Sequence, residues 1–201
     1  MTLALIMARM KRWLRTDKYA DVESSLRMAL QAVRGVDRDI LEWKWVLVAV
    51  HAAVQGFFVL LLSKGNSLLT LKGPHARAWL KAYRSGGPWP QKLDLDYFLE
   101  LYAKAKQEIS SGLLADPTNY DEGMRTLNNL RNGFIHFSVD GWSVELAGLP
   151  MICMRCLEVT DHLAWRSSAI RWRSEAQSTR MRRLLRAITR QLRHLDTLYK
   201  R

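Results

Sequence analysis

Apolar residues recur at helical spacing along most of the chain, which predicts an all-α protein. Breaks in this pattern separate the expected helices. The expected helices cover residues 19–33, 37–62, 75–83, 94–110, 119–138, 150–172 and part of 173–201. Only residues 142–146 alternate apolar and polar positions, and this stretch is expected to form a lone strand or an extended connector. The pattern therefore favours a helical bundle.

Short local motifs mark where several of these helices begin or end. Gly35 is expected to cap the first helix at its C-terminus. Asn119, followed by Glu122 three residues later, resembles a capping box, and Pro150 suits the first turn of the next helix. Residues 85–90, Ser-Gly-Gly-Pro-Trp-Pro, form the clearest loop in the chain.

Residues 45–62 approach the length and apolarity of a membrane-spanning helix. His51, Gln55 and Gly56 interrupt the stretch near its middle, and no second such segment follows. We therefore expect a buried core helix rather than a membrane span. His51 and Gln55 share one face of it, and such residues are usually hydrogen-bonded inside the core. The alternative is that they support a functional site from beneath.

The distribution of charge narrows the range of partners. The chain has a net charge of +12, and residues 166–201 hold eleven Lys or Arg against only Glu175 and Asp196. Such an excess of positive charge favours a polyanionic partner, either nucleic acid or an acidic membrane surface. The alternative is an Arg-rich helix whose arginines are simply solvated.

The last helix combines this charge with an apolar seam. The seam residues, at spacings of four and three, are Met181, Leu185, Ile188, Leu192, Leu195 and Tyr199. The candidate RNA-binding residues on its other faces are Arg180, Arg182, Arg183, Arg186, Arg190 and Arg193. The seam suits packing on the bundle or self-association. The expected organisation is a basic N-terminal segment (1–18), a helical bundle (19–172) and an Arg-rich C-terminal helix (173–201).

The two cysteines, Cys153 and Cys156, are too few for a disulfide framework, which favours a reducing compartment. A zinc site would need four ligands, and only His162 lies nearby in sequence. We therefore expect two buried thiols one helical turn apart. The sequence contains no phosphate-binding glycine loop or nucleophile elbow, and neither a metal nor a cofactor is expected.

The helix expected over residues 119–138 separates apolar from polar side chains. Its apolar face consists of Leu127, Leu130, Phe134 and Phe137, and the opposite face of Asn128, Asn129, Asn132 and His136. Asn132 and His136 are one turn apart, and Arg131 on the flank has a side chain long enough to swing toward them. Gly133 leaves room for a backbone or a substrate to come close.

These residue types match the needs of RNA cleavage without a metal ion. The reaction needs a group that takes the proton of the ribose 2′-OH and a positive charge on the phosphate. Histidine suits the first role, and the planar guanidinium of arginine suits the second. His136 and Arg131 are therefore candidate catalytic residues, with Asn132 as an orienting neighbour. The alternative is an exposed helix with ordinary polar residues on its outer side.

Residues 131–136, Arg-Asn-Gly-Phe-Ile-His, resemble the Arg-x4–6-His motif of the HEPN ribonuclease superfamily, including the polar residue that often follows the arginine. The position of the motif late in a helical bundle also fits this superfamily. Residues 130–137 and the Trp- and Ala-rich second helix are similar to a plasmid- and defence-associated bacterial subgroup. The resemblance covers about residues 19–165. It implies a HEPN-like bundle of four to five helices, to which the basic C-terminal helix is an addition.

The resemblance also implies a function. HEPN domains pair through their motif helices, so that two Arg–His sets face one composite groove. The usual activity is a metal-independent endoribonuclease of a toxin or defence system, which leaves a 2′,3′-cyclic phosphate. His136 would then be the general base or acid and Arg131 the phosphate contact. The expected partners are RNA, a second copy of the chain and, for a toxin, an antitoxin protein, all in the bacterial cytoplasm.

Two other functions stay open. Some HEPN domains lack nuclease activity and serve only to bind nucleic acid or a partner protein. A membrane-associated basic helical protein is the third reading, based on residues 45–62 and the basic ends of the chain.

Some HEPN toxins also carry a tyrosine two residues after the histidine, which a nucleotidyltransferase antitoxin modifies. Ser138 occupies that position here, which argues against this mode of control.

Overall fold

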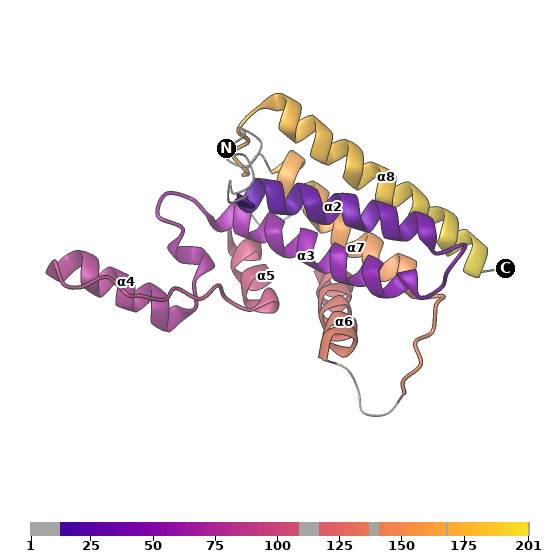
Figure 1. Ribbon diagram of the computed structural model, residues 1–201, viewed down its shortest axis with the longest axis horizontal. Coiled ribbons are helices and arrows are strands. Elements are labelled where there is room, and N and C mark those ends of the chain that lie inside the picture. Colours follow the sequence, from indigo (N-terminus) through magenta and orange to yellow (C-terminus); the bar gives the residue numbers. More distant parts are fainter. Residues whose placement is uncertain (1–12, 109–116, 137–140, 168, 201) are drawn as a thin grey trace, which may run out of the picture.

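Figure 1 shows the protein as a computed structural model, which describes residues 13–108, 117–136, 141–167 and 169–200. The structure is 73% helical and, within the described residues, has no strand, so the prediction of an all-α bundle is confirmed. The α-helices are α2 (Lys18–Gly35), α3 (Glu42–Leu62), α4 (Gly73–Ser85), α5 (Phe98–Gln107), α6 (Pro117–His136), α7 (Leu149–Asp161) and α8 (Glu175–Tyr199). A 3-10 turn, η2 (Leu68–Thr70), and a π-helical turn, η3 (His162–Arg166), complete the elements.

Helix α3 is the centre of the bundle. Helices α2, α5, α6 and α7 pack around it, and Val50 and Phe57 are among its fully buried side chains. Gly56 lets α2 come close, because a Cβ atom there would lie 2.3 Å from Cγ2 of Val22. By length and composition α3 is able to cross a membrane, but 67% of its apolar stretch is buried inside the protein. The burial predicted for this helix is confirmed.

Helix α8 lies along α2 and α7 on the outside of the bundle (Figure 1). Its apolar seam faces inward: Met181, Ile188 and Leu192 are fully buried. At the end of the seam, the indole N–H of Trp43 donates a hydrogen bond of 3.0 Å to the phenol oxygen of Tyr199. The seam is therefore used for packing on the bundle and is not left free for self-association.

The prediction of one helix over residues 150–172 is wrong. The α-helical part ends at Asp161, and η3 and an irregular segment follow. The reason is aromatic packing: Trp165 and Trp172 stack with ring centroids 5.4 Å apart, and both contact the Phe57 ring. In a continuous helix these two tryptophans would lie about 10 Å apart along the axis. Burying both rings against α3 therefore requires the chain to turn.

Other boundaries also differ from expectation. Helix α5 begins at Phe98 rather than at residue 94, because the preceding residues pair with the segment that leads into α4. Helix α6 begins at Pro117, so Asn119 lies inside its first turn rather than before its first residue. Residues 142–145 form an extended connector. Phe137, a predicted member of the apolar face of α6, lies outside the described residues.

Residues 63–97 form an arm that carries α4 away from the bundle (Figure 1). At its base, the backbone N–H of Asp96 donates to the carbonyl oxygen of Thr70 at 2.9 Å. The ammonium group of Lys104 on α5 donates to the carbonyl oxygen of Leu71 at 2.9 Å and to the Asp96 carboxylate at 2.6 Å. Backbone and side-chain bonds thus fix the arm to the bundle.

Candidate functional site

Helix α6 holds the motif residues because its other side is locked into the core. Met124 and Leu127 are fully buried, and Leu130 and Phe134 pack partly buried against the same core. Gly123 lets α7 approach, since a Cβ atom there would lie 3.3 Å from Cβ of Arg155. The predicted apolar face is therefore confirmed for its described members. Fixing this face determines the directions in which the polar residues of α6 point.

The structure brings two of the three predicted catalytic residues together. The Arg131 Nη1 atom donates a hydrogen bond of 2.9 Å to Oδ1 of Asn132, and both side chains are half-buried. His136 is exposed on the last turn of the same helix. It shares no hydrogen bond with Arg131 or Asn132, all three being described residues. The guanidinium group is thus oriented by its neighbour, while the imidazole is open to solvent.

The space expected beside Gly133 for a substrate is filled by the chain itself. A Cβ atom at this glycine would lie 3.2 Å from Cη2 of Trp142, and the Trp142 ring packs on Phe134 with centroids 4.6 Å apart. The small residue is therefore explained by this indole, a close approach from another segment of the same chain. Trp142 stays 43% exposed and adds an apolar surface near the end of α6.

Beneath the motif lies a buried histidine of α3. His51 Nε2 is 3.3 Å from Oδ1 of Asn128, and its ring stacks on Phe98 with centroids 4.1 Å apart. The pKa of His51 is lowered to about 4, mainly by burial. The hydrogen bond to Asn128 opposes this shift, and the nearby charge of Arg131 adds to it. A neutral His51 can therefore sit next to the Arg131 guanidinium. The possibility that His51 supports the site from beneath agrees with this contact, whereas the side chain of Gln55 makes no hydrogen bond among the described residues.

We expect His51 to make folding stability depend on pH. Its pKa is about 4 in the folded protein and about 6.5 in the unfolded chain, so the unfolded chain takes up the proton first as pH falls. The contribution of His51 is full above pH 6.5 and is lost by about pH 4, an effect of about 3 kcal/mol in the free energy of unfolding. Urea denaturation at a series of pH values should show a shallower dependence for His51→Gln than for the wild type.

The comparison with His51→Gln isolates this one group. Burial also lowers the pKa of His162. Because His162 is present in both proteins, its effect on the pH dependence cancels in the comparison. His194→Gln, at an exposed position on α8, is the matched control and should behave like the wild type. Equal pH dependence in wild type and His51→Gln would contradict the assignment of a neutral His51 under α6.

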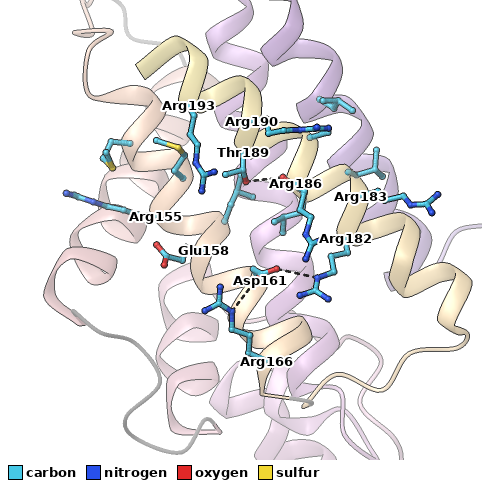
Figure 2. Close-up of a pocket in the computed structure, with 17 residues that line it drawn as sticks. Arg155, Glu158, Asp161, Arg166, Arg182, Arg183, Arg186, Thr189, Arg190 and Arg193 are labelled. Carbon is cyan, nitrogen blue, oxygen red and sulfur yellow. Dashed lines mark hydrogen bonds and ion pairs between the residues drawn. The ribbon is translucent and has the colours of Figure 1, made fainter. Parts of the chain in front are cut away.

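A second feature is a groove of about 1010 Å³ between α7 and α8, shown in Figure 2. Seven arginines line it, namely Arg155, Arg166, Arg182, Arg183, Arg186, Arg190 and Arg193. Glu158 and Asp161 are the acidic residues of the lining, and Leu30, Met154 and Leu184 contribute apolar surface. We call this feature the arginine groove.

Most of the positive charge in the arginine groove is not neutralised. Asp161 lies between two arginines, 3.2 Å from Nε of Arg166 and 3.8 Å from Nε of Arg182, as the dashed lines of Figure 2 indicate. The other five arginines of the groove form no ion pair among the described residues. Several guanidinium groups are therefore available to phosphate oxygens, which they bind with paired N–H donors.

The groove contains most, but not all, of the predicted RNA-binding residues. Five of the six arginines predicted on α8 line it, whereas Arg180 points elsewhere, with Nε 3.6 Å from the Glu23 carboxylate. Sequence reasoning missed Arg155 and Arg166, which belong to α7 and η3. The signal available was weak: Arg155, Glu158 and Asp161 recur at three-residue spacing on a polar side of α7. Only the packing of α7 against α8 shows that they join the same groove.

Arg155 links the groove to the motif helix. Its Cβ atom lies against Gly123 of α6, and the residue also lines the groove. Arg131 follows Gly123 by eight residues, which is about 12 Å along the axis of an α-helix. Arg155 therefore lies between the arginine groove and the helix that carries Arg131.

Cys153 and Cys156 are both free and buried, as predicted. Burial raises the pKa of Cys153 to about 12 and raises that of Cys156 well above its usual value, so both are neutral thiols. The described residues contain no group of three or more His, Cys, Asp or Glu placed to hold a metal ion. These thiols belong to the core where α7 meets α3 and α6.

No protein-family model, curated protein or solved structure matches this chain. The candidate site therefore stands on its own geometry: an Arg131–Asn132 pair, an exposed His136 at the end of α6, and an arginine groove alongside.

Proposed function

We propose that the protein is a metal-independent endoribonuclease of the HEPN type, acting as a toxin or defence effector. One observation carries the proposal: the Arg131 guanidinium is oriented by Asn132 at 2.9 Å, and an exposed His136 follows on the last turn of the same helix. A guanidinium and an imidazole on one helix supply the two groups that 2′-OH attack needs.

In the proposed reaction, His136 takes the proton of a ribose 2′-OH. The 2′-oxygen then attacks the neighbouring phosphorus, and the bond from phosphorus to the 5′-oxygen breaks. The leaving 5′-oxygen receives a proton, so the products are a 2′,3′-cyclic phosphate and a 5′-hydroxyl. Arg131 stabilises the negative charge that builds up on the phosphoryl oxygens, and Asn132 holds the guanidinium in place.

A second copy of the chain fits this chemistry. Pairing through α6 brings two Arg–His sets to one groove, so that one histidine takes a proton while the other gives one. The end of α6 carries apolar surface suited to such pairing, since Ile135 is 36% and Trp142 is 43% exposed. The proposal includes this homodimer, a cytoplasmic location with the RNA substrate and, for a toxin, a neutralising antitoxin protein.

The arginine groove supplies affinity for the substrate. Binding of phosphates there releases counterions from the RNA, so affinity depends on salt and little on sequence. Glu158 and Asp161 leave most of the seven guanidinium groups uncompensated. Any preference for a particular RNA sequence would then come from contacts near α6.

The test is cleavage of single-stranded RNA by the full-length protein in the presence of EDTA, with analysis of the product ends. We expect cleavage that EDTA does not reduce, with 2′,3′-cyclic phosphate and 5′-hydroxyl ends. A DNA strand of the same sequence, which lacks the 2′-OH, should stay intact and serves as the control. Products with a 5′-phosphate, or activity that EDTA abolishes, would contradict the proposed chemistry.

The second candidate function is RNA binding without cleavage. The observation in its favour is that one chain forms the arginine groove by itself, whereas His136 shares no hydrogen bond with Arg131 or Asn132. RNA binding by a wild-type protein that leaves the RNA intact would decide for this function.

A further inference from the structure

The arm exposes a cluster of three aromatic rings. Trp79 stacks on Tyr83 with ring centroids 5.4 Å apart and an interplanar angle of 10°, and it contacts Trp89 with centroids 5.2 Å apart. Tyr83 is 67% and Trp89 is 57% exposed. Trp79 is half-buried between its two neighbours. We call Trp79, Tyr83 and Trp89 the aromatic cluster.

The local chain geometry builds this cluster without help from the bundle core. Trp79 and Tyr83 are one turn apart on α4, so their rings meet on one face. Gly86, with a φ of 63°, turns the chain sharply after α4. The turn brings Trp89 back onto Trp79. Large apolar rings held in order at the surface, rather than in the core, mark a binding surface.

The charge of the arm complements an anionic ligand. Residues 72–92 contain five Lys or Arg and no Asp or Glu. Arg77, Lys81 and Arg84 are exposed and line a shallow depression of about 380 Å³ on α4, together with Leu80 and Ser85. Arg84 directly follows Tyr83, so a cation and an exposed ring lie on adjoining faces of one helical turn.

We propose that the arm is a binding site for unpaired nucleotides of single-stranded RNA. Bases stack on the exposed faces of Tyr83 and Trp89. The strand then continues around α4, where its phosphates contact Arg84, Lys81 and Arg77 on the other side of the helix. Aromatic faces combined with cations are the general means by which proteins hold single strands with little sequence preference. This inference rests on RNA being the ligand of the proposed function and adds where the strand is held.

The aromatic cluster suits a single strand better than a duplex or a membrane. In duplex RNA the bases are stacked on each other and their faces are not available to protein rings. A helix that lies in a membrane interface buries a broad apolar face, in which leucines accompany the aromatic residues. The aliphatic residues of α4 are Ala76, Ala78, Leu80 and Ala82, so three of the four are alanines.

The arm is also tied to the motif helix. Lys104 of α5 bonds to the base of the arm at Leu71 and Asp96. On the same helix, Tyr102 and Lys106 both donate to the carboxylate of Asp121 on α6, each at 2.8 Å. Helix α5 therefore holds the arm and α6 in a fixed relation. A strand captured on the arm is restrained relative to the proposed cleavage site.

The test measures the affinity of the full-length protein for a labelled single-stranded oligouridylate and for an RNA duplex by fluorescence anisotropy. The variant is Tyr83→Leu with Trp89→Leu, two positions that are more than half exposed and do not hold the core. We expect its affinity for the single strand to fall about tenfold or more, because each base–ring stack contributes about 1–3 kcal/mol. Tyr83→Phe with Trp89→Phe keeps the rings and should retain most of the affinity.

Trp45→Leu is the matched control, since Trp45 is 47% exposed on α3 with a lysine over its ring, outside the arm. It should bind RNA like the wild type. An unchanged single-strand affinity in the Leu variant would overturn the proposal. An equal loss of affinity for the single strand and the duplex would also overturn it. A variant that loses binding only to phosphatidylglycerol vesicles would assign the aromatic cluster to a membrane surface instead.

A second measurement needs no variant. Photo-crosslinking of the wild type to an oligonucleotide containing 4-thiouridine, with mapping of the modified peptide, should place the crosslinks within residues 79–89. Crosslinks confined to other segments would overturn the proposal. The outcome separates from that of the nuclease test: intact RNA crosslinked to the arm would refute cleavage only, and cleavage with normal binding by the Leu variant would refute the arm only.

Discussion

Replacing His136 by alanine should lower the rate of RNA cleavage by a factor of about 10²–10⁴, the usual effect of losing a positioned general base or acid. The affinity for RNA should change little, because the imidazole is exposed at the end of α6, apart from the arginine groove. The fold should not change either, since His136 makes no core contact. Single-turnover cleavage and equilibrium binding, measured on the same preparation, separate the two effects.

Arg131→Ala should cause a rate loss of similar order, because the charge that stabilises the transition state is removed. Arg131→Lys keeps the charge but not the planar pair of donors to phosphate and Asn132, so it should recover only part of the activity. His194→Ala, at an exposed histidine of α8, is the matched control and should cleave like the wild type. Full activity in both His136→Ala and Arg131→Ala would exclude the proposed active site.

The helices could be predicted because their apolar periodicity matches their burial. The stretch around Phe57 was predicted as a buried core helix, and α3 is the central element. The apolar face of α6 was predicted from helical spacing, and its members Leu127 and Phe134 both pack on the core. In these segments local pattern and tertiary packing agree, so the sequence is enough.

The turn after α7 and the arm could not be predicted because tertiary contacts decide them. Trp165 and Trp172 suit a helix by spacing, yet their packing on Phe57 ends it. The start of α5 depends on the pairing of Asp96 with Thr70, which are 26 residues apart in sequence. Contacts between distant segments have no local signal in a single sequence.

The candidate site could be predicted only in part, because some of its residues come together through tertiary packing. The position of Asn132 and His136 on one side of α6 follows from helical spacing, and so does the basic face of α8. Arg155 lines the same groove as this basic face only because of the way α7 packs. Trp142 covers Gly133 because of the path of a connector that has no regular secondary structure. The sequence pattern located the helices of the candidate site but not the surfaces that lie between them.

Neutralising the arginine groove should weaken RNA binding strongly and make it less sensitive to salt. Each guanidinium that contacts a phosphate of a single strand contributes about 0.7 to the slope of log affinity against log salt. Converting Arg186, Arg190 and Arg193 to glutamine should therefore lower the slope by about two units and the affinity at 0.1 M salt by about a hundredfold. Anisotropy titrations between 50 and 300 mM salt measure both quantities.

A variant with the same loss of charge elsewhere separates local contact from net charge. Arg15, Arg38 and Arg171 are exposed, form no ion pair among the described residues and do not line the groove. Their conversion to glutamine removes three charges but should change the slope by far less than the groove variant does. Equal slopes for the two triple variants would mean that RNA responds only to the overall charge of +12. If the groove variant binds RNA as tightly as the wild type, the RNA does not bind at α8. The arginines of α8 are the largest group of uncompensated cations in the groove.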